Sequence, residues 1–354
     1  MTRLNSNPSG APAQTEGDAS PAAVPTPAQA RPNSVLTWIA TPAARALIAL
    51  ALILLLGVIF NSNGTFFKSA IHRDALREAS IYGILACGMT LVIISGGIDL
   101  AVGSVLALVA VSFSIFTINW GWSGWLAIPA VLLLGACTGA ISGSLTSWGR
   151  LQPFIATLAM FTFARGLAKY LTGGSKVLPK MAEDYTVNYP PVFTGIDQRI
   201  LGGNVSVVTL IFIACALFSY VLLARHRFGR QLYAVGGNEK AAALSGVPVN
   251  RVKTTAYVLS GFFAAVAGIC QSAQERQGDP NTGAAYELTA IAIVVIGGTN
   301  LMGGRGGIGL TVLGTLTIGY LSKILSINQY SDAGRQMLTG LIIVIAVLAQ
   351  RKRA

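Results

Sequence analysis

The sequence predicts an all-α, polytopic membrane protein with about ten transmembrane helices. Of its 354 residues, 53% are hydrophobic and only 11% are charged, and the mean hydropathy is +0.62. A soluble domain carries about 25% charged residues. The 40 glycines suit close packing between helices in lipid. The apolar residues are also gathered into long runs, which is the pattern that membrane-spanning helices require.

Residues 1–34 precede the first apolar run and form a separate region. They are rich in Pro, Ala, Ser, Gln and Thr and show no apolar period. This composition is typical of a disordered tail, which we place in the cytoplasm. The tail lacks the charged start and immediate apolar core of a cleavable signal peptide. The rest of the chain, 35–354, is predicted to be one transmembrane domain.

The spans are predicted from the apolar runs. They lie near residues 44–60, 79–95, 103–118, 125–147, 153–172, 205–224, 254–273, 287–298, 307–325 and 336–350. Several are shorter than the roughly 20 residues that a straight span needs. Glycines interrupt the runs within 79–118 and 287–325, which predicts broken or re-entrant helices in both regions.

The distribution of charge predicts the orientation of the spans. The loop 225–253 holds six of the 25 Lys and Arg residues against one acid, Glu239, and a second basic cluster ends the chain at 351–353. With ten spans both clusters lie on one side, which the positive-inside rule identifies as the cytoplasm, together with both termini. The net charge of +12 therefore reflects topology and contact with anionic lipids of the bilayer rather than binding to nucleic acid.

The centre of this basic loop is predicted to form a short helix. Asn238 to Ser245 contains helix-forming Ala, Glu and Lys, and the stretch ends at Gly246. A short helix presented to the cytoplasm is suited to receive force from a separate subunit.

Two glycine-interrupted segments echo each other and form a weak internal repeat. The first reads ISGGIDLAVGS over 94–104, and the second reads VIGGTNLMGG over 295–304. The matched positions are Gly96 with Gly297, Gly97 with Gly298, and Asp99 with Asn300.

Glycine-interrupted segments at matching positions of two halves point to a substrate path in transporters. The carboxylate of Asp99 and the amide of Asn300 are therefore candidates for contact with a hydroxylated solute, and a charge at membrane depth favours function. The alternative is that both residues only cap helices, since Asp and Asn are ordinary cap residues.

Two further patterns lie on predicted spans. Arg165, late in the span 153–172, is expected near the outer surface, where it either snorkels to water or contacts a solute. Gly135, Gly139 and Gly143 recur every four residues on one helix face, which allows two backbones to approach closely within the subunit or between subunits.

The longest outer loops are 173–204 and 274–286, and both carry prolines and acids. They are either receptors for an external partner or solvated connections.

Enzymatic chemistry and cofactors are not expected on this chain. It has no GxxxxGK[ST] motif and no Gly-Lys pair, so nucleotide hydrolysis has no site. His72 and His226 stand alone, no CxxC motif occurs, and the cysteines read as small buried hydrophobes, so no metal site is predicted. The cysteines are Cys87, Cys137, Cys215 and Cys270.

Four stretches of the sequence resemble those of a known family. They are GMTLVIISGGIDLAVGS at 88–104, QPFIATLAMFTFARGLA at 152–168, AVGGNEKAAALSGVPVNRVK at 234–253 and AIVVIGGTNLMGGRGG at 292–307. The chain resembles the membrane permease subunit of ribose-type ABC importers, the inner-membrane component of binding-protein-dependent monosaccharide transport. The resemblance covers roughly residues 45 to 350.

The resemblance implies the other parts of the machine. A second permease subunit, an ATP-binding cassette ATPase subunit and a periplasmic sugar-binding protein would act with this chain in the bacterial inner membrane. It also implies that the cytoplasmic helix fits a groove on the ATPase. The residues that take this coupling role are Gly237, Asn238, Glu239, Ala241, Ala242, Leu244 and Gly246. The sugar itself and the identity of the second permease stay open, and an ion-coupled carrier or a passive facilitator is the alternative.

Overall fold

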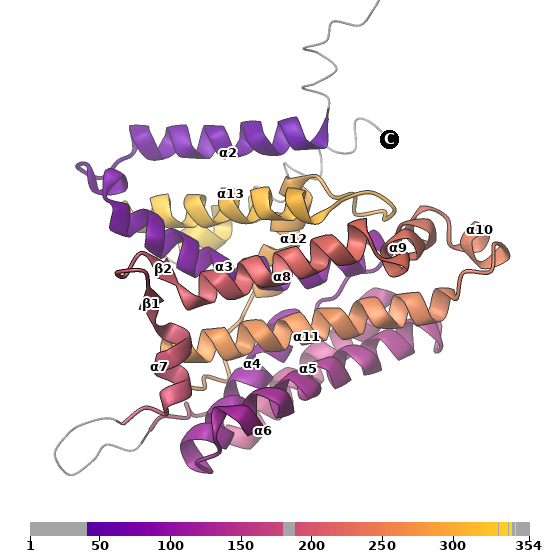
Figure 1. Cartoon of the computed structure of the whole chain (residues 1–354), viewed down its shortest axis with the longest axis horizontal. Helices are drawn as coiled ribbons and strands as arrows, with labels where there is room; N and C mark the ends of the chain where they lie inside the picture. The colour runs from indigo at the N-terminus through magenta and orange to yellow at the C-terminus, as the bar shows by residue number, and fades with distance from the viewer. Residues whose placement is uncertain (1–40, 180–187, 332, 339, 342–343, 345–354) are drawn as a thin grey trace, which may run out of the picture.

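The structure is a computed structural model that describes residues 41–179, 188–331, 333–338, 340–341 and 344. The predicted tail 1–34 and most of the predicted span 336–350 lie outside these residues. The long helices run side by side along one direction, with α9 and α10 at one end of the bundle and α7, β1 and β2 at the other (Figure 1). We call these the α10 end and the α7 end.

In the part of the chain that the structure describes, eight helical segments are long and apolar enough to cross a membrane. They are α2 (Pro42–Ile59), α3 (Ser69–Ile94), α4 (Val102–Ser114) continued by the π-helical turn η2 (Ile115–Asn119), α5 (Gly124–Ser147), α6 (Pro153–Thr172), α8 (Val207–Ala224), α11 (Val249–Glu275) and α13 (Ile308–Ile327). A ninth apolar helix, α12 (Tyr286–Gly297), has only 12 residues. The predicted fold class is confirmed.

The shorter elements lie at the two ends. At the α7 end are the 3-10 turn η1 (Thr65–Phe67), α7 (Pro191–Asp197) and a two-stranded antiparallel ribbon of β1 (Arg199–Ile200) and β2 (Val205–Ser206). At the α10 end are α9 (Arg227–Gly237) and α10 (Glu239–Leu244). The sequence predicted only α10 among these elements.

Helix α3 begins at Ser69, whereas the sequence predicted a start near 79. Its first turns are polar, so they do not belong to the apolar run from which the span was predicted. These turns project beyond the apolar band and pair with the connections at the α7 end. Arg77 forms an ion pair with Asp197 of α7, and Arg73 Nη1 donates a hydrogen bond to Asn204 Oδ1 at 2.6 Å.

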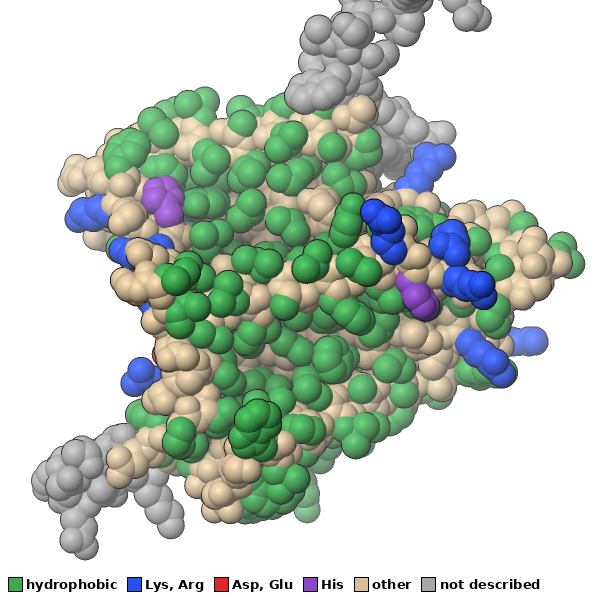
Figure 2. Space-filling view, viewed as in Figure 1, with side chains coloured by type: hydrophobic (Ala, Val, Ile, Leu, Met, Phe, Trp, Pro, Cys, Tyr) green, Lys and Arg blue, Asp and Glu red, His purple; other side chains and the backbone are tan. Residues whose placement is uncertain are grey.

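The core of the bundle is built from α3, α4 and α11. In the apolar window of α3, 83% of the residues are buried, against 17% for α2. The peripheral helices α2, α6 and α8 instead expose large apolar side chains such as Leu52, Phe163 and Leu217. Figure 2 shows the result, which is a broad hydrophobic band with Lys and Arg gathered at the α10 end and a few at the α7 end. Such a band suits contact with lipid.

The glycines at 135, 139 and 143 lie on the seam between α5 and α11. A methyl group on Gly139 would overlap the carbonyl oxygen of Tyr257, and one on Gly143 would lie 2.9 Å from the Cα atom of Thr254. Gly135 lies equally close to Gly261 of α11. The contacts therefore support the interpretation in which this motif packs helices within the subunit.

Gly139→Ala should destabilise the fold, because its methyl group overfills the seam at a cost of about 1–3 kcal/mol. Gly166→Ala in α6 is the matched control, since no atom lies within 4 Å of the added methyl group. Alanine is also favoured over glycine in a helix by roughly 0.5–1 kcal/mol. Thermal unfolding of the detergent-purified variants measures the difference, and equal melting temperatures would contradict the seam.

Candidate functional site

The segment between α3 and α4, residues 95–101, turns back into the bundle. Gly96 has a φ of +84°, which lets the chain reverse after α3 ends at Ile94. Asp99 then lies beside Ser260, near the middle of α11, and a methyl group on Gly88 of α3 would lie 2.9 Å from the Cα atom of that same serine. The segment thus leads from the end of α3 back toward the level of Gly88. The predicted re-entrant geometry is present here.

Asp99 uses both carboxylate oxygens inside the protein. Its Oδ1 accepts from the backbone N–H of Ala101 at 3.0 Å, and its Oδ2 accepts from Ser260 Oγ at 2.7 Å. The residue is 4% exposed. Gly97 packs directly beneath Tyr257, whose hydroxyl donates to the carbonyl oxygen of Ile98 at 3.4 Å. The turn is therefore closed by protein groups on several sides.

Asn300 makes the same local turn in the second segment. Its Oδ1 accepts from the backbone N–H of Met302 at 3.0 Å, two residues ahead, as Asp99 does with Ala101. The chain leaves α12 through Gly298, with a φ of +106°, while Gly297 packs against the carbonyl oxygen of Leu310 in α13. The sequence echo thus corresponds to a repeated turn geometry.

The two echoing segments meet each other and α9 at what we call the glycine junction, formed by Ile94, Gly96, Gly236, Gly303 and Gly304. The N–H of Gly304 donates to the carbonyl oxygen of Ile94 at 2.9 Å. A methyl group on Gly303 would lie 3.0 Å from the Cα atom of Gly96, and one on Gly236 would overlap the Ile94 oxygen. Three backbones therefore touch at a spacing that only glycine permits.

Tyr233 of α9 adds a second tie between this helix and the second segment. Its hydroxyl donates to the carbonyl oxygen of Gly306 at 2.9 Å. Burial raises the pKa of the Tyr233 phenol above its usual value, so the group stays protonated and remains a donor at neutral pH.

Helix α10 follows the junction directly and is largely exposed. The side chain of Asn238 caps it by accepting from the N–H of Ala241 at 3.0 Å, and Gly246 closes it with a φ of +80°. Leu244 is 90% exposed, whereas Ala242 is 5% exposed and faces the protein.

The remaining predicted coupling residues, Gly237, Glu239 and Ala241, are exposed, and Lys253 Nζ lies 2.6 Å from Glu239 Oε2. This ion pair links the start of α10 to the first turns of α11.

Arg165 is directed at the segment that leads into α12. Its Nη1 donates to the carbonyl oxygens of Pro280 and Thr282, each at 2.7 Å. In the described part of the chain, its buried Nη2 and the buried Oε2 of Glu287 have no hydrogen-bond partner. Glu287 Oε2 also lies against Gly103 at the start of α4. The starts of both short helices therefore come together, with Arg165 beside them.

Comparison with known proteins decides the class of this assembly. A family model described as "Branched-chain amino acid transport system / permease component" matches residues 73–347. The chain belongs to this permease family. It is therefore a membrane transport subunit rather than an enzyme, and its apolar helices make it a multi-pass membrane protein.

Curated relatives of the permease carry sugar-import names. The ribose import permease protein of Haemophilus influenzae is 38% identical over 301 residues, which are 85% of this chain and 91% of the relative. That of Escherichia coli K12 is 37% identical over 314 residues, 86% and 92% of the two chains. The fructose import permease protein of Bifidobacterium longum is 34% identical over 290 residues, 81% and 84%. No solved structure matches the permease significantly.

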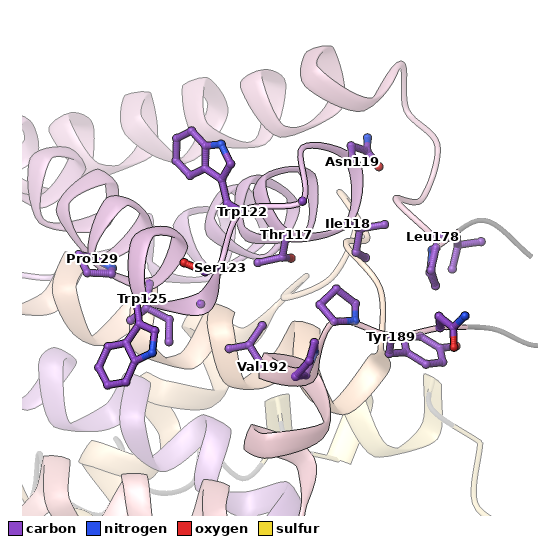
Figure 3. A pocket seen from close by; sticks show the side chains of 17 residues that line it. Thr117, Ile118, Asn119, Trp122, Ser123, Trp125, Pro129, Leu178, Tyr189 and Val192 are labelled. Carbon is purple, nitrogen blue, oxygen red and sulfur yellow. The ribbon is translucent and has the colours of Figure 1, made fainter.

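A wide hollow of about 1470 Å³ opens at the α7 end of the permease. Figure 3 shows Trp125 and Pro129 at one end of this hollow and Leu178 and Tyr189 at the other. Trp120 and Trp122 both lie against Phe116, with ring centroids 5.0 and 4.7 Å away. Tryptophan gathers where a membrane meets water, so this cluster suits the interface at the α7 end.

The sequence pointed to the two echoing segments but not to the contact between them. Asp99 and Asn300 lie in separate turns, and the echoing segments touch through Ile94, Gly303 and Gly304 instead. Gly236 was overlooked, although the Gly-Gly pair just before the predicted helix matched the pairs in both echoing segments.

Asp99→Ala should destabilise the permease by about 1–3 kcal/mol, because it leaves the Ala101 N–H and the Ser260 hydroxyl buried without an acceptor. Asp99→Asn keeps one acceptor oxygen and should recover most of that loss. Thermal unfolding measures both. Loss of transport by Asp99→Ala at an unchanged melting temperature would support solute contact in place of capping.

Proposed function

We propose that this permease is the membrane subunit of an ATP-driven importer for a monosaccharide. The observation that carries the proposal is similarity over 81–86% of the chain to import permeases named for ribose and fructose. A further relative is named as an L-arabinose transport system permease. These sugars share a neutral ring bearing several hydroxyl groups, so a small neutral polyol is the expected cargo.

The ATPase subunit docks on α10. Leu244 projects from a six-residue helix at the end where basic residues gather, and that basic end faces the cytoplasm by the positive-inside rule. An exposed apolar side chain on a capped helix suits insertion into a groove of a partner.

Force from the ATPase reaches the spans through the glycine junction. Helix α9 ends at Gly237 and α10 starts at Glu239, so a displaced α10 moves Gly236 directly. Gly236 touches the end of α3 and the segment after α12. Because the contacts join backbone to backbone, no flexible side chain lies between the segments to absorb the displacement. Closure of the ATPase would thus tilt both broken spans between two packed arrangements.

A binding protein would deliver the sugar at the α7 end, which faces the periplasm in this orientation. The connections there include Lys176 and Arg276, whose side chains are 52% and 50% exposed and offer charged groups for docking. A second permease, either another copy or a related chain, completes the pathway.

Reconstitution tests the proposal. Proteoliposomes holding the permease and its ATPase should accumulate D-ribose, D-fructose or L-arabinose only when ATP and the binding protein are both supplied. Uptake by the permease alone down a sugar or ion gradient would instead establish a carrier that needs no ATPase.

Leu244→Asp should reduce recovery of the ATPase with the affinity-tagged permease about tenfold or more, because it places a charge in the apolar contact. Leu201→Asp is the matched control, since Leu201 is 72% exposed at the α7 end. Mass spectrometry of the purified complex measures both. Equal ATPase recovery from the two variants would contradict docking on α10.

Gly236→Ala should leave the ATPase bound but reduce ATP-driven sugar uptake about tenfold or more, because the added methyl group forces the glycine junction apart. Gly195→Ala in α7 is the control, as no atom lies within 4 Å of its added methyl group. Normal uptake by a well-folded Gly236→Ala variant would show that force does not pass through this contact.

A further inference from the structure

A second cavity lies inside the permease among α3, α11, α12 and α13. Its volume is about 480 Å³, within the roughly 300–1,000 Å³ of small-molecule sites. Its lining comes from the middle of α3, the last turns of α11, the first turn of α12, the second half of α13 and, beyond α13, Arg335, Gln336 and Gly340. The polar lining residues include Glu78, Tyr82, Gln271, Gln274, Tyr286 and Ser322. Polar side chains gathered inside apolar helices mark solute pathways.

Two tyrosines form an aromatic wall of this cavity. The rings of Tyr82 and Tyr286 lie 4.6 Å apart, centroid to centroid, with their planes inclined at 54°. Both side chains are only half-buried, so part of each ring faces the cavity. A tyrosine combines an apolar face with a hydroxyl group. This combination matches a sugar, whose C–H faces are apolar and whose edge carries hydroxyl groups.

Gln271 provides hydrogen-bonding groups beside this wall. It is 8% exposed, and its Nε2 donates to Glu275 Oε1 at 2.6 Å and to the Tyr286 hydroxyl at 3.4 Å. A carboxamide both donates and accepts, as a sugar hydroxyl does. Gln274 lines the same side, and its Nε2 donates a long hydrogen bond of 3.4 Å to the carbonyl oxygen of Arg77. This amide is therefore weakly held and available to a ligand.

The acid that lines the cavity is held in an ion pair. Glu78 Oε1 lies 2.7 Å from Lys323 Nζ, so its charge is paired. Arg335 also lines the cavity. An unpaired acid would favour a cation, whereas a paired acid together with carboxamide and hydroxyl groups suits a polyol.

The cavity is also connected to the moving parts. Tyr286 is the first residue of α12, and the segment just before it is held by Arg165. The other end of α12 passes through Gly298 to the glycine junction. A tilt of this 12-residue helix would therefore shift one wall of the cavity when the junction moves.

We propose that this cavity is a binding station for the transported sugar inside the permease, with Tyr82, Tyr286 and Gln271 as its main contacts. The assignment rests on the proposed function. The sugar enters from the α7 end, packs against the tyrosines, and is released when α12 tilts.

The test measures how much sugar is carried for each ATP hydrolysed in proteoliposomes holding the complete complex, with D-ribose as the probe. Tyr286→Leu and Gln271→Leu should each lower this ratio about tenfold, because binding-protein docking still triggers hydrolysis while the sugar loses its contacts. Tyr220→Leu is the matched control, since Tyr220 is 54% exposed on α8, away from the cavity, and this variant should keep the wild-type ratio.

A second readout is protection from chemical labelling. In a permease whose native cysteines are replaced, Ser322→Cys should react with a maleimide at least threefold more slowly when D-ribose is present. Unchanged transport ratios in both cavity variants, or an equal fall in Tyr220→Leu, would overturn the cavity assignment alone. Failure of the wild-type complex to carry ribose, fructose or arabinose would overturn the proposed function, and the assignment with it.

Discussion

The structure depends on one constraint, which is that backbone polar groups inside a membrane must be bonded by the protein itself. A continuous helix satisfies this need along its length, but a broken helix exposes N–H and C=O groups at each break. The described residues of the permease include two such breaks, at 95–101 and 298–307, and a hydrogen bond joins them to each other. The bond from the Gly304 N–H to the Ile94 carbonyl satisfies one group from each break. Helix α9 packs against both breaks at the same contact. The hydrogen bond that satisfies the backbone groups therefore also links the two broken spans mechanically to α9.

The polar side chains at the breaks follow from the same constraint. Asp99 and Asn300 each accept a hydrogen bond from a backbone N–H two residues ahead, which closes a turn that is buried at Asp99 and only half-buried at Asn300. The second carboxylate oxygen of Asp99 accepts a hydrogen bond from the hydroxyl of Ser260 on α11. An amide side chain would present an N–H donor at this position instead of an acceptor. The carboxylate thus ties its turn to a neighbouring core helix. Within one described subunit, this geometry accounts for both residues without a bound solute.

The sequence predicted those features of the fold that depend on interactions between residues close together in the chain. Apolar runs predicted the long helices, and the composition around Asn238 predicted α10, because both depend on residues close in sequence. The polar first turns of α3 were missed because their stability comes from partners such as Asp197 and Asn204, far along the chain. The echo of Gly96 and Gly297 predicted two similar turns. It did not predict that they touch, since contact between distant segments leaves no periodic pattern.

The short length of α12 explains how events at the two ends can be linked. A helix of 12 residues spans about 18 Å, which is little more than half of a bilayer core of about 30 Å. It cannot be anchored in both interfaces and is instead held by protein at each end. Arg165 fixes the approach to Tyr286 at one end, and Gly298 leads to the glycine junction at the other. A helix held in this way tilts as a unit when one end is displaced, whereas a full span would have to drag its interfacial side chains through lipid.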